Sequence, residues 1–386
     1  MTKIYSRTEL ANSMAAQLIK PTGLDTGLRS GLFLSGIRRI GKTTFLRNDL
    51  IPALQKLGAV VVYVDLWSNP QASPADLVYH AVADTLRDLA TPGSALLEKL
   101  RAIKGLDIGA LGVKLGVKIE SVEKANGVTL AQVFEELIDK TQTDVVLIID
   151  EVQHALASDD GGNLLLALKA CRDAINPRPD TPGHFIFIGT GSNRALIGEL
   201  ATRKNQAFAG AYSADYPVLN GEYVEFLLQQ LRNDGYTGLP SQKVASEAFK
   251  TLGSRPEELL RALRLALQSH ANNPTTHPDT VLPAIALTLR NAAADIELEK
   301  VEARGPLAMA IFNRIASKPG GSKGIYSAEA AEDYSTALGR TVKIEEIQPV
   351  AMDLMAANLI MRRGHGLYEI TDPFIKEIWK EKKGLL

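Results

Sequence analysis

Eight residues near the N-terminus have the types and spacing of a phosphate-binding loop, because the pattern G-x-x-x-x-G-K-[ST] is matched from Gly36 to Thr43. The two glycines of such a loop let the backbone bend where a side chain would clash, so that N–H groups can turn toward phosphate oxygens. A helix that begins near Lys42 adds the positive end of its dipole. We therefore expect nucleotide phosphates to be bound by Gly36, Ile37, Arg38, Arg39, Ile40, Gly41, Lys42, Thr43 and Thr44.

Two side chains of this loop carry chemistry of their own. The ammonium group of Lys42 can reach the β- and γ-phosphates, and the hydroxyl of Thr43 can bind Mg²⁺. A chance match on an ordinary strand-to-helix turn is the alternative. The apolar run Leu32-Phe33-Leu34 before the loop and the helical spacing of apolar residues after it favour nucleotide binding.

A second stretch places two carboxylates after a run of five apolar residues, because Asp150 and Glu151 follow Val145–Ile149. We expect this run to be a buried strand, and ligands of open α/β sheets bind at the carboxyl ends of strands. Asp150 fits the role of holding Mg²⁺, mostly through water, and Glu151 that of orienting or deprotonating the attacking water. The alternative is a strand-end cap or a surface pair. With a P-loop upstream, the pair favours NTP hydrolysis over phosphoryl transfer to a small molecule.

Further polar residues follow the next predicted strand, His184–Gly189. Thr190, Ser192 and Asn193 can reach the γ-phosphate or the water if this strand lies beside the one that ends at Asp150. We take Thr190 and Asn193 as the better candidates for a catalytic role. Ordinary turn chemistry of the sequence T-G-S-N is the alternative, and the sequence does not decide between them.

Three arginines are candidates for contacts with phosphate. Arg194 and Arg203 could act as arginine fingers in a self-assembled complex, although surface arginine is the favoured interpretation of each. Arg255 could contact phosphate from the start of a helix and report the nucleotide state. The alternative for Arg255 is a helix-start turn, with Pro256 near the first helical position.

The elements expected around these residues are strands alternating with helices, followed by helices alone. This pattern predicts an α/β core with a parallel sheet, then a helical lid, then a C-terminal winged helix with a hairpin. We expect the boundaries 1–216, 217–304 and 305–386, and a last unit with three helical segments. The glycine-containing segment 106–119 suggests a small hairpin, with a surface insertion as the simpler interpretation.

Helices are expected at Thr8–Ile19, Lys42–Leu57, Ala75–Leu89, Thr129–Ile138, Gly162–Ile175, Glu222–Leu231, Gln242–Leu252, Glu257–Gln268 and Val281–Val301, and a further strand at Ala59–Asp65.

Composition narrows the functional class. The chain has 386 residues, a hydrophobic fraction of 45% and a net charge of −1, which is typical of a globular protein without a global field for nucleic acid or membrane. Its single cysteine, Cys171, excludes an intramolecular disulfide framework. No N-terminal apolar segment and no apolar run of membrane-spanning length is present, so we expect a soluble, cytoplasmic protein with no membrane partner.

The predicted winged helix raises the possibility of DNA binding. Residues 305–386 contain eleven basic and ten acidic side chains, so this unit is close to neutral. Arg362 and Arg363 in the expected hairpin, with His365 in its turn, could contact a DNA backbone or minor groove. A solvated hairpin on a winged helix that contacts a protein partner is an equal alternative.

Several of these motifs together resemble a known group. The segments GIRRIGKTT, LIIDEVQ and GTGSN, the Gly253–Pro256 motif and the C-terminal winged helix resemble the archaeal-type P-loop ATPases of the STAND and AAA+ branches, close to the origin-recognition ATPases. The opening segment Tyr5–Leu10 is similar to the segment of that group that helps to enclose adenine. The resemblance implies an ASCE-type core, ATP, Mg²⁺, a lid that closes on nucleotide, and a nucleotide-dependent switch or homo-oligomer. It also implies that Arg255 reads the γ-phosphate.

The predicted function is Mg²⁺-dependent ATP hydrolysis that drives a conformational or assembly switch. A DNA-loading or DNA-remodelling ATPase is the second hypothesis. The third is an adaptor that is stabilised by ATP, hydrolyses it negligibly and holds a protein partner.

Overall fold

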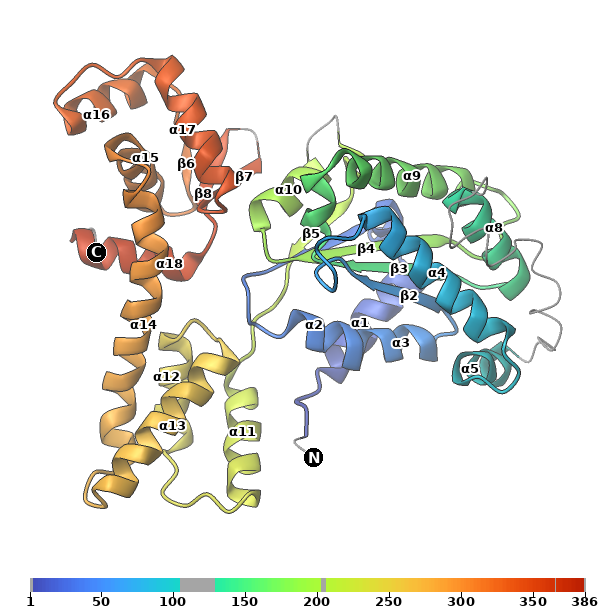
Figure 1. Ribbon diagram of the computed structural model, residues 1–386, viewed down its shortest axis with the longest axis horizontal. Coiled ribbons are helices and arrows are strands. Elements are labelled where there is room, and N and C mark those ends of the chain that lie inside the picture. The colour runs from blue at the N-terminus through green and yellow to red at the C-terminus, as the bar shows by residue number, and fades with distance from the viewer. Residues whose placement is uncertain (1–2, 105–128, 203–205, 365, 385–386) are drawn as a thin grey trace.

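The computed structural model describes residues 3–104, 129–202, 206–364 and 366–384 (Figure 1). The expected hairpin or insertion at 106–119 lies outside these ranges, as do Arg203 and His365. The described chain forms an α/β core, a group of helices that follows it, and a C-terminal unit that contains a small second sheet.

The core is built on a five-stranded parallel sheet with the order β2-β3-β4-β1-β5. Strand β4 therefore separates the strand that leads into the P-loop, β1, from the strand that ends at Asp150, β3. This order confirms the predicted ASCE-type P-loop core. The strands are β1 Leu32–Ser35, β2 Val60–Asp65, β3 Val145–Asp150, β4 Phe185–Gly191 and β5 Tyr212–Asp215.

Strands β4 and β5 differ from expectation. Strand β4 continues through Thr190 to Gly191, so Thr190 lies in a strand and not in a turn. Strand β5, at the edge of the sheet beside β1, was not predicted. Its four residues are mostly exposed and contain no apolar run, so the local pattern carries no strand signal.

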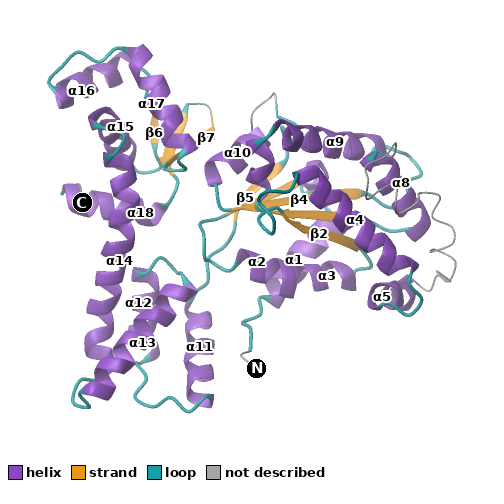
Figure 2. Cartoon of the chain, in the orientation of Figure 1, coloured by secondary structure: helices purple, strands orange, loops and turns teal. Residues whose placement is uncertain are grey.

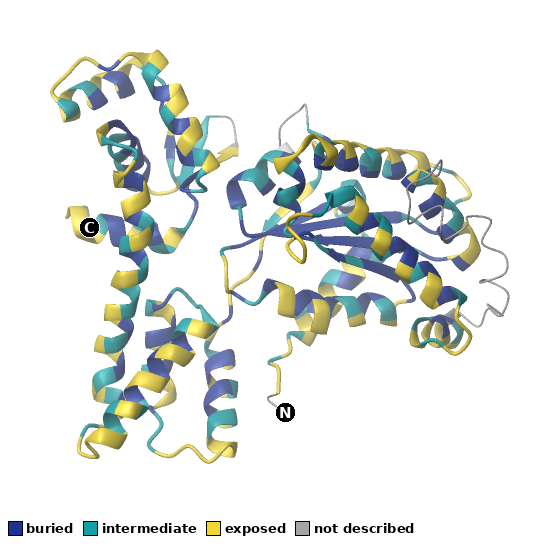
Figure 3. Ribbon diagram, in the orientation of Figure 1, coloured by how far each residue is buried: buried dark blue, intermediate teal, exposed yellow. Residues whose placement is uncertain are grey.

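Helices cover both faces of the sheet, and strands β1 to β4 are almost completely buried between them (Figure 3). This double burial explains why β2 and β3 are continuous apolar runs instead of alternating ones. One face packs against α4 (Pro74–Ala90), α5 (Ala95–Lys104), α8 (Leu130–Thr141), α9 (Asp159–Ile175) and α10 (Arg194–Thr202). The other face packs against α1 (Thr8–Ile19), α2 (Lys42–Phe45) and α3 (Ile51–Lys56).

The helix after the P-loop is continuous but not regular. A π-helical turn, Leu46–Leu50, joins α2 to α3. Pro52 follows this turn and has no N–H to donate to the carbonyl one helical turn earlier, and its ring would clash there. A wider local turn relieves that clash.

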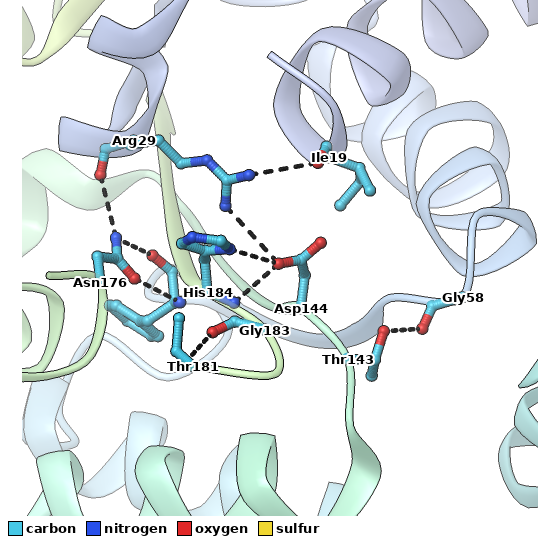
Figure 4. Close-up of polar contacts among 10 residues, drawn as sticks. Ile19, Arg29, Gly58, Thr143, Asp144, Asn176, Thr181, Gly183 and His184 are labelled. Atoms are coloured by element: carbon cyan, nitrogen blue, oxygen red, sulfur yellow. Dashed lines mark hydrogen bonds and ion pairs between the residues drawn. The ribbon is translucent and has the colours of Figure 1, made fainter. Parts of the chain in front are cut away.

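Polar side chains fix the amino ends of the central strands, opposite the P-loop (Figure 4). Asp144 Oδ1 accepts a hydrogen bond from His184 N at 2.8 Å and lies 3.6 Å from Arg29 Nη1. The side chain of Asn176 bonds both backbone groups of Phe185, at 2.8 and 2.9 Å. These contacts hold β3 and β4 in register before the chain reaches the site at their other ends.

The helical lid follows the core without strands (Figure 2). Its helices bury one apolar cluster, which also contacts Tyr5 of the N-terminal segment. The last helix, α14, belongs to two clusters: Leu282 and Ala286 pack in the lid, whereas Ala294 and Leu298 pack in the C-terminal unit. The helices are α11 Gly221–Asn233, α12 Gln242–Thr251, α13 Pro256–Asn272 and α14 Pro278–Glu302.

The C-terminal unit has four helices in its described residues, not the three expected, because α18 follows the predicted hairpin. Its sheet has the order β6-β8-β7, and β7 and β8 form the antiparallel hairpin. Its assignment as a winged helix stays a prediction. The elements are α15 Pro306–Ala316, β6 Ser322–Lys323, α16 Ala328–Leu338, α17 Ile344–Ala356, β7 Ile360–Gly364, β8 Leu367–Ile370 and α18 Pro373–Lys383. Every helix in the described ranges is too short or too polar to span a lipid bilayer.

Candidate nucleotide site

The predicted P-loop lies between the carboxyl end of β1 and the start of α2, as its sequence requires. Gly41 stands immediately before the helix with a φ of 88°, a conformation that favours glycine. A Cβ added at Gly36 would lie 2.8 Å from Ile40 Cδ1, the end of a side chain that can shift, and 3.3 Å from Tyr216 Cβ. The backbone conformation therefore favours glycine at Gly41, and close packing favours it at Gly36.

Lys42 points back into the loop that it follows. Its Nζ donates hydrogen bonds to the carbonyl oxygens of Gly36 at 2.6 Å and Ile37 at 2.8 Å. Burial lowers the pKa of Lys42 to about 8, although the carboxylates of Glu151 and Asp150 act in the opposite direction. A poorly solvated ammonium group inside a glycine loop is well suited to bind an anion.

Asp150 joins the three strands that meet at the site. Its Oδ2 accepts a hydrogen bond from Thr43 Oγ1 at 2.7 Å and another from Tyr63 OH at 3.2 Å, and its Oδ1 accepts one from Thr190 Oγ1. The Asp150 carboxylate is buried. The sequence places Thr190 at the site only if its strand lies beside the strand that ends at Asp150. Strand β4 does pair with β3.

Glu151 follows Asp150 in a left-handed conformation, with a φ of 55°. Its Oε2 accepts hydrogen bonds from the backbone N of Ser192 at 3.2 Å, from Ser192 Oγ at 2.9 Å and from Gln153 Nε2. A Cβ at Gly191 would lie 1.9 Å from Gln153 Oε1, so the Gln153 side chain would have to move if residue 191 were not glycine. The end of β4 therefore holds the carboxylate that the sequence assigns to water activation.

Asn193 and Arg194 both bond groups within the chain, and the catalytic role of Asn193 stays a prediction. Asn193 Oδ1 accepts a hydrogen bond from Leu196 N at 3.1 Å and thereby caps the start of α10. Arg194 is buried and donates to Thr371 O at 2.5 Å and to Asp215 Oδ2 at 2.8 Å. It is therefore not a surface arginine, and the sequence did not indicate this because Asp215 and Thr371 lie in other segments of the chain. A role as an arginine finger in a self-assembled complex stays a prediction.

Arg255 is held by the C-terminal unit. Its Nη2 donates to Asp372 Oδ2 at 2.7 Å, and its guanidinium lies 4.8 Å from the ring centroid of Phe374. The helix-start turn is also present, because Arg255 precedes α13 and Pro256 opens it. The contact of Arg255 with phosphate stays a prediction. The P-loop does contact the lid through another arginine, since Arg39 Nε lies 3.4 Å from Glu257.

A cavity of about 310 Å³ opens beside the P-loop. Gly41 and Thr44 line one part of it, and Tyr5, Tyr216 and Tyr223 contribute aromatic surface from the N-terminal segment, the core and the lid. The volume is that of a small-molecule site, and its walls are mostly apolar. This arrangement can bind the nucleoside part of a nucleotide whose phosphates lie in the P-loop.

Several contacts at this site were not found from the sequence. Tyr63 and Gln153 bond the two carboxylates, and Asp215 and Asp372 bond two of the candidate arginines. Tyr63 could have been found, because it is a polar residue near the end of an apolar strand. Gln153 lies only two residues after Glu151, whereas Asp215 and Asp372 carry no local signal, because their contacts join separate segments of the chain.

Comparison with known proteins agrees with this geometry. A family model described as "ATPase domain predominantly from Archaea" matches residues 22–262. The Aeropyrum pernix ORC2 protein in its ADP form has a similar structure, with a TM-score of 0.54 and 13% identity, over 100% of this chain and 95% of that one. The same protein in its ADPNP–ADP complexes gives 0.51 and 14%, over 99% and 96%. The search of curated proteins found no match.

At these identities the structural matches show the fold alone, whereas the family model covers more than half of the chain. The family model confirms the predicted resemblance to archaeal-type P-loop ATPases, and the likeness to an origin-recognition protein is one of fold. The chain therefore belongs to the family of ATPase domains predominantly from Archaea, and it is an ATP-binding P-loop ATPase.

Proposed function

We propose that this ATPase hydrolyses ATP with Mg²⁺ and uses the cycle to change how its C-terminal unit contacts the core. The observation that carries the hydrolytic part is the contact between Thr43 and Asp150, whose oxygens lie 2.7 Å apart. This contact places the P-loop next to the carboxyl end of β3, which carries the acidic residues. The domain limits 1–216, 217–304 and 305–386, with a winged helix last, are part of this proposal.

The donor set fits Mg²⁺. A hydroxyl and a carboxylate are hard oxygen ligands, and Mg²⁺ typically takes one or two of these and completes its shell with water and phosphate oxygens. In the described part of the chain, no group of three or more His, Cys, Asp or Glu side chains could hold an ion alone, which agrees with a site completed by nucleotide. The bound ion would neutralise charge that develops on the phosphates.

Residues of the protein bind the phosphates, activate the water and align the carboxylate of Asp150. Lys42 exchanges its two carbonyl partners for phosphate oxygens, and the N–H groups of the P-loop bind further oxygens. Glu151 orients and deprotonates the attacking water once its carboxylate turns from Ser192. Thr190, already bonded to Asp150, keeps that carboxylate aligned.

The switch is proposed from the contacts between the core, the lid and the C-terminal unit. Arg194 at the start of α10 bonds Thr371, Asp215 at the end of β5 bonds Arg363, and Arg255 at the start of α13 bonds Asp372. Arg194 lies three residues after β4, and the intervening Ser192 bonds Glu151 while Thr190 of β4 bonds Asp150. A shift of this segment on hydrolysis would therefore change the contacts that hold the C-terminal unit.

DNA loading or remodelling remains the second candidate. Arg363 of β7 is an exposed hairpin cation, but it donates to Asp215 at 2.9 Å and to Glu369 at 2.8 Å. Binding of DNA by this hairpin would then require the C-terminal unit to leave Asp215. A nucleotide-stabilised adaptor is the third candidate, and a protein partner or a homo-oligomer is compatible with any of the three.

A phosphate-release assay tests these proposals. We expect turnover by the full chain with Mg²⁺ and none with EDTA. Thr43→Ser, which keeps the hydroxyl, should retain turnover, and Thr43→Val, which has the same shape without it, should lose on the order of a hundredfold. Stimulation by duplex DNA would favour the loader, and absence of turnover with intact ATP binding would favour the adaptor.

A further inference from the structure

The cavity beside the P-loop contains one carboxylate whose bonding is incomplete. Asp49 lines this cavity together with Gly41, Thr44 and Tyr216. Its side chain is buried, with a relative exposure of 6% for the residue. Oδ1 accepts a hydrogen bond from Ser6 Oγ, but Oδ2 has no hydrogen-bond partner among the described residues and is itself buried. A buried carboxylate oxygen is costly to leave without a donor, so Oδ2 would gain from a donor that reaches it.

The position of Asp49 along the helix is the second observation. It lies seven residues after Lys42, which corresponds to roughly 10 Å along the helix axis at the usual rise per residue. The π-helical turn Leu46–Leu50 contains it, and such turns occur frequently at functional sites. Phosphates bound at Lys42 would therefore leave the sugar and base to extend along this helix toward Asp49.

We propose that Asp49 selects adenine by accepting a hydrogen bond from the 6-amino group of the base on Oδ2. This inference rests on the proposed nucleotide site and adds its base specificity. An ionised carboxylate accepts hydrogen bonds and donates none. The 6-amino group of adenine is a donor, whereas the 6-oxo groups of hypoxanthine and guanine are acceptors and would face the carboxylate with like partial charge.

The surrounding residues hold Asp49 in place for this task. Ser6 fixes one carboxylate oxygen from the N-terminal segment. Arg7 of that segment stacks over Tyr216 at 5.1 Å and donates to Pro217 O at 2.5 Å, and Tyr5 packs against Tyr223. The aromatic rings provide flat apolar surface for a base, and a preformed acceptor at its edge would supply the specificity.

Two other donors could meet the same oxygen. The ribose hydroxyls are one, and the N1–H and 2-amino groups of guanine are the other. Membership of an ATPase family favours adenine over guanine. The analogues of ATP separate these possibilities: purine riboside triphosphate lacks the 6-amino group, ITP replaces it with an oxo group and carries an N1–H, GTP adds the 2-amino group to these, and 2′-deoxy-ATP lacks a ribose hydroxyl.

The test is equilibrium binding of these five triphosphates to the full chain without Mg²⁺. We expect wild-type protein to bind ATP at least about tenfold more tightly than purine riboside triphosphate or ITP, and 2′-deoxy-ATP nearly as tightly as ATP. In Asp49→Asn, whose amide can face either group, the ratio of ATP to ITP should fall to within about threefold. Glu247→Gln changes an exposed carboxylate of α12 that does not line this cavity and should keep the wild-type ratio.

The outcomes are distinguishable. Equal binding of ATP and ITP by wild-type protein overturns the role of Asp49 but leaves the nucleotide site intact, and this comparison needs no folded variant. A preference for GTP, or a penalty confined to 2′-deoxy-ATP that Asp49→Asn removes, also overturns it in favour of guanine or ribose recognition. Failure of wild-type protein to bind any triphosphate would instead remove the proposed function.

Discussion

The guanidinium of Arg255 and the carboxylate of Asp372 form an ion pair at 2.7 Å, across the boundary between lid and C-terminal unit. Both side chains are less than one-fifth exposed, at 16% and 19%. The residue that was predicted to read the nucleotide is therefore bound by the C-terminal unit. Burial raises the pKa of Asp372, while the nearby charge of Arg255 acts against that rise. An ATPase in which Arg255 changes partners would couple nucleotide state to the position of this unit.

Asp372→Asn should release Arg255 while it keeps the cap of α18, since an amide oxygen can still accept from Phe374 N. We expect a loss of about 2 kcal/mol of docking free energy, seen as a larger radius in small-angle scattering, and tighter ATP binding. Glu381→Gln is the matched control, because it breaks the ion pair of α18 with Arg290 and leaves Arg255 paired. Unchanged scattering and affinity in Asp372→Asn would show that the contact does not restrain Arg255.

Glu151→Gln should keep ATP binding and lose turnover. The amide has nearly the same shape and can still accept from Ser192, but it cannot take a proton from water. We expect a fall in kcat of roughly 10²–10⁴-fold with a dissociation constant for ATP within a few-fold of wild type. Glu247→Gln on the exposed face of α12 is the control. Hydrolysis at the wild-type rate would remove Glu151 from the mechanism.

Nucleotide affinity should fall as the pH rises through about 8, because burial lowers the pKa of Lys42 to about 8. The protonated amine binds phosphate, and phosphate in turn raises its pKa, so affinity is fully present below pH 8 and declines above it. Between the pKa values of Lys42 in the free and the bound protein, the affinity should fall by at most about tenfold per pH unit. Titration calorimetry with ADP from pH 7 to 9.5 without Mg²⁺ would measure this slope. Lys42→Ala should bind weakly at every pH, and an equal slope in that variant would contradict the assignment.

Asp215 offers a test of the DNA alternative. Burial would raise the pKa of Asp215, but the hydrogen bonds from Arg194 and Arg363 outweigh it and hold the pKa below its usual range. Asp215→Asn weakens the hold on Arg363. If the hairpin binds DNA, affinity for duplex DNA should rise several-fold, and the slope of log affinity against log salt should steepen by about 0.9. Glu377→Gln, on α18 away from the hairpin contact, is the control. No change in slope would exclude a phosphate contact by Arg363.

Two adjacent glycines of α9 should respond oppositely to alanine. A Cβ at Gly161 would lie 2.1 Å from the backbone oxygen of Ala155, whereas a Cβ at Gly162 would meet nothing within 4 Å. Gly162→Ala should stabilise the protein by about 0.5–1 kcal/mol, because alanine loses less backbone entropy in a helix. Gly161→Ala should destabilise it, since the backbone must move. Urea unfolding of both variants measures the difference, and equal effects would contradict the packing at Ala155.

The sequence alone determined the P-loop, the acidic strand end and the α/β class. These depend on local patterns: glycines at fixed spacing, and apolar runs such as Val145–Ile149 that can be buried only inside a covered parallel sheet. The lid helices follow in the same way from helical periodicity, and their observed ends lie within a few residues of those expected.

Only the tertiary structure decided which side chains these elements bring together. The edge strand β5 gains its conformation from pairing with β1, because its own residues carry no strand pattern. Arg194 and Arg255 find carboxylates on segments that are distant in the chain, and Asp49 meets Ser6 only because the N-terminal segment folds across the P-loop helix. Spacing along the chain encodes local conformation, whereas the pairing of isolated polar groups depends on the packing of the whole molecule.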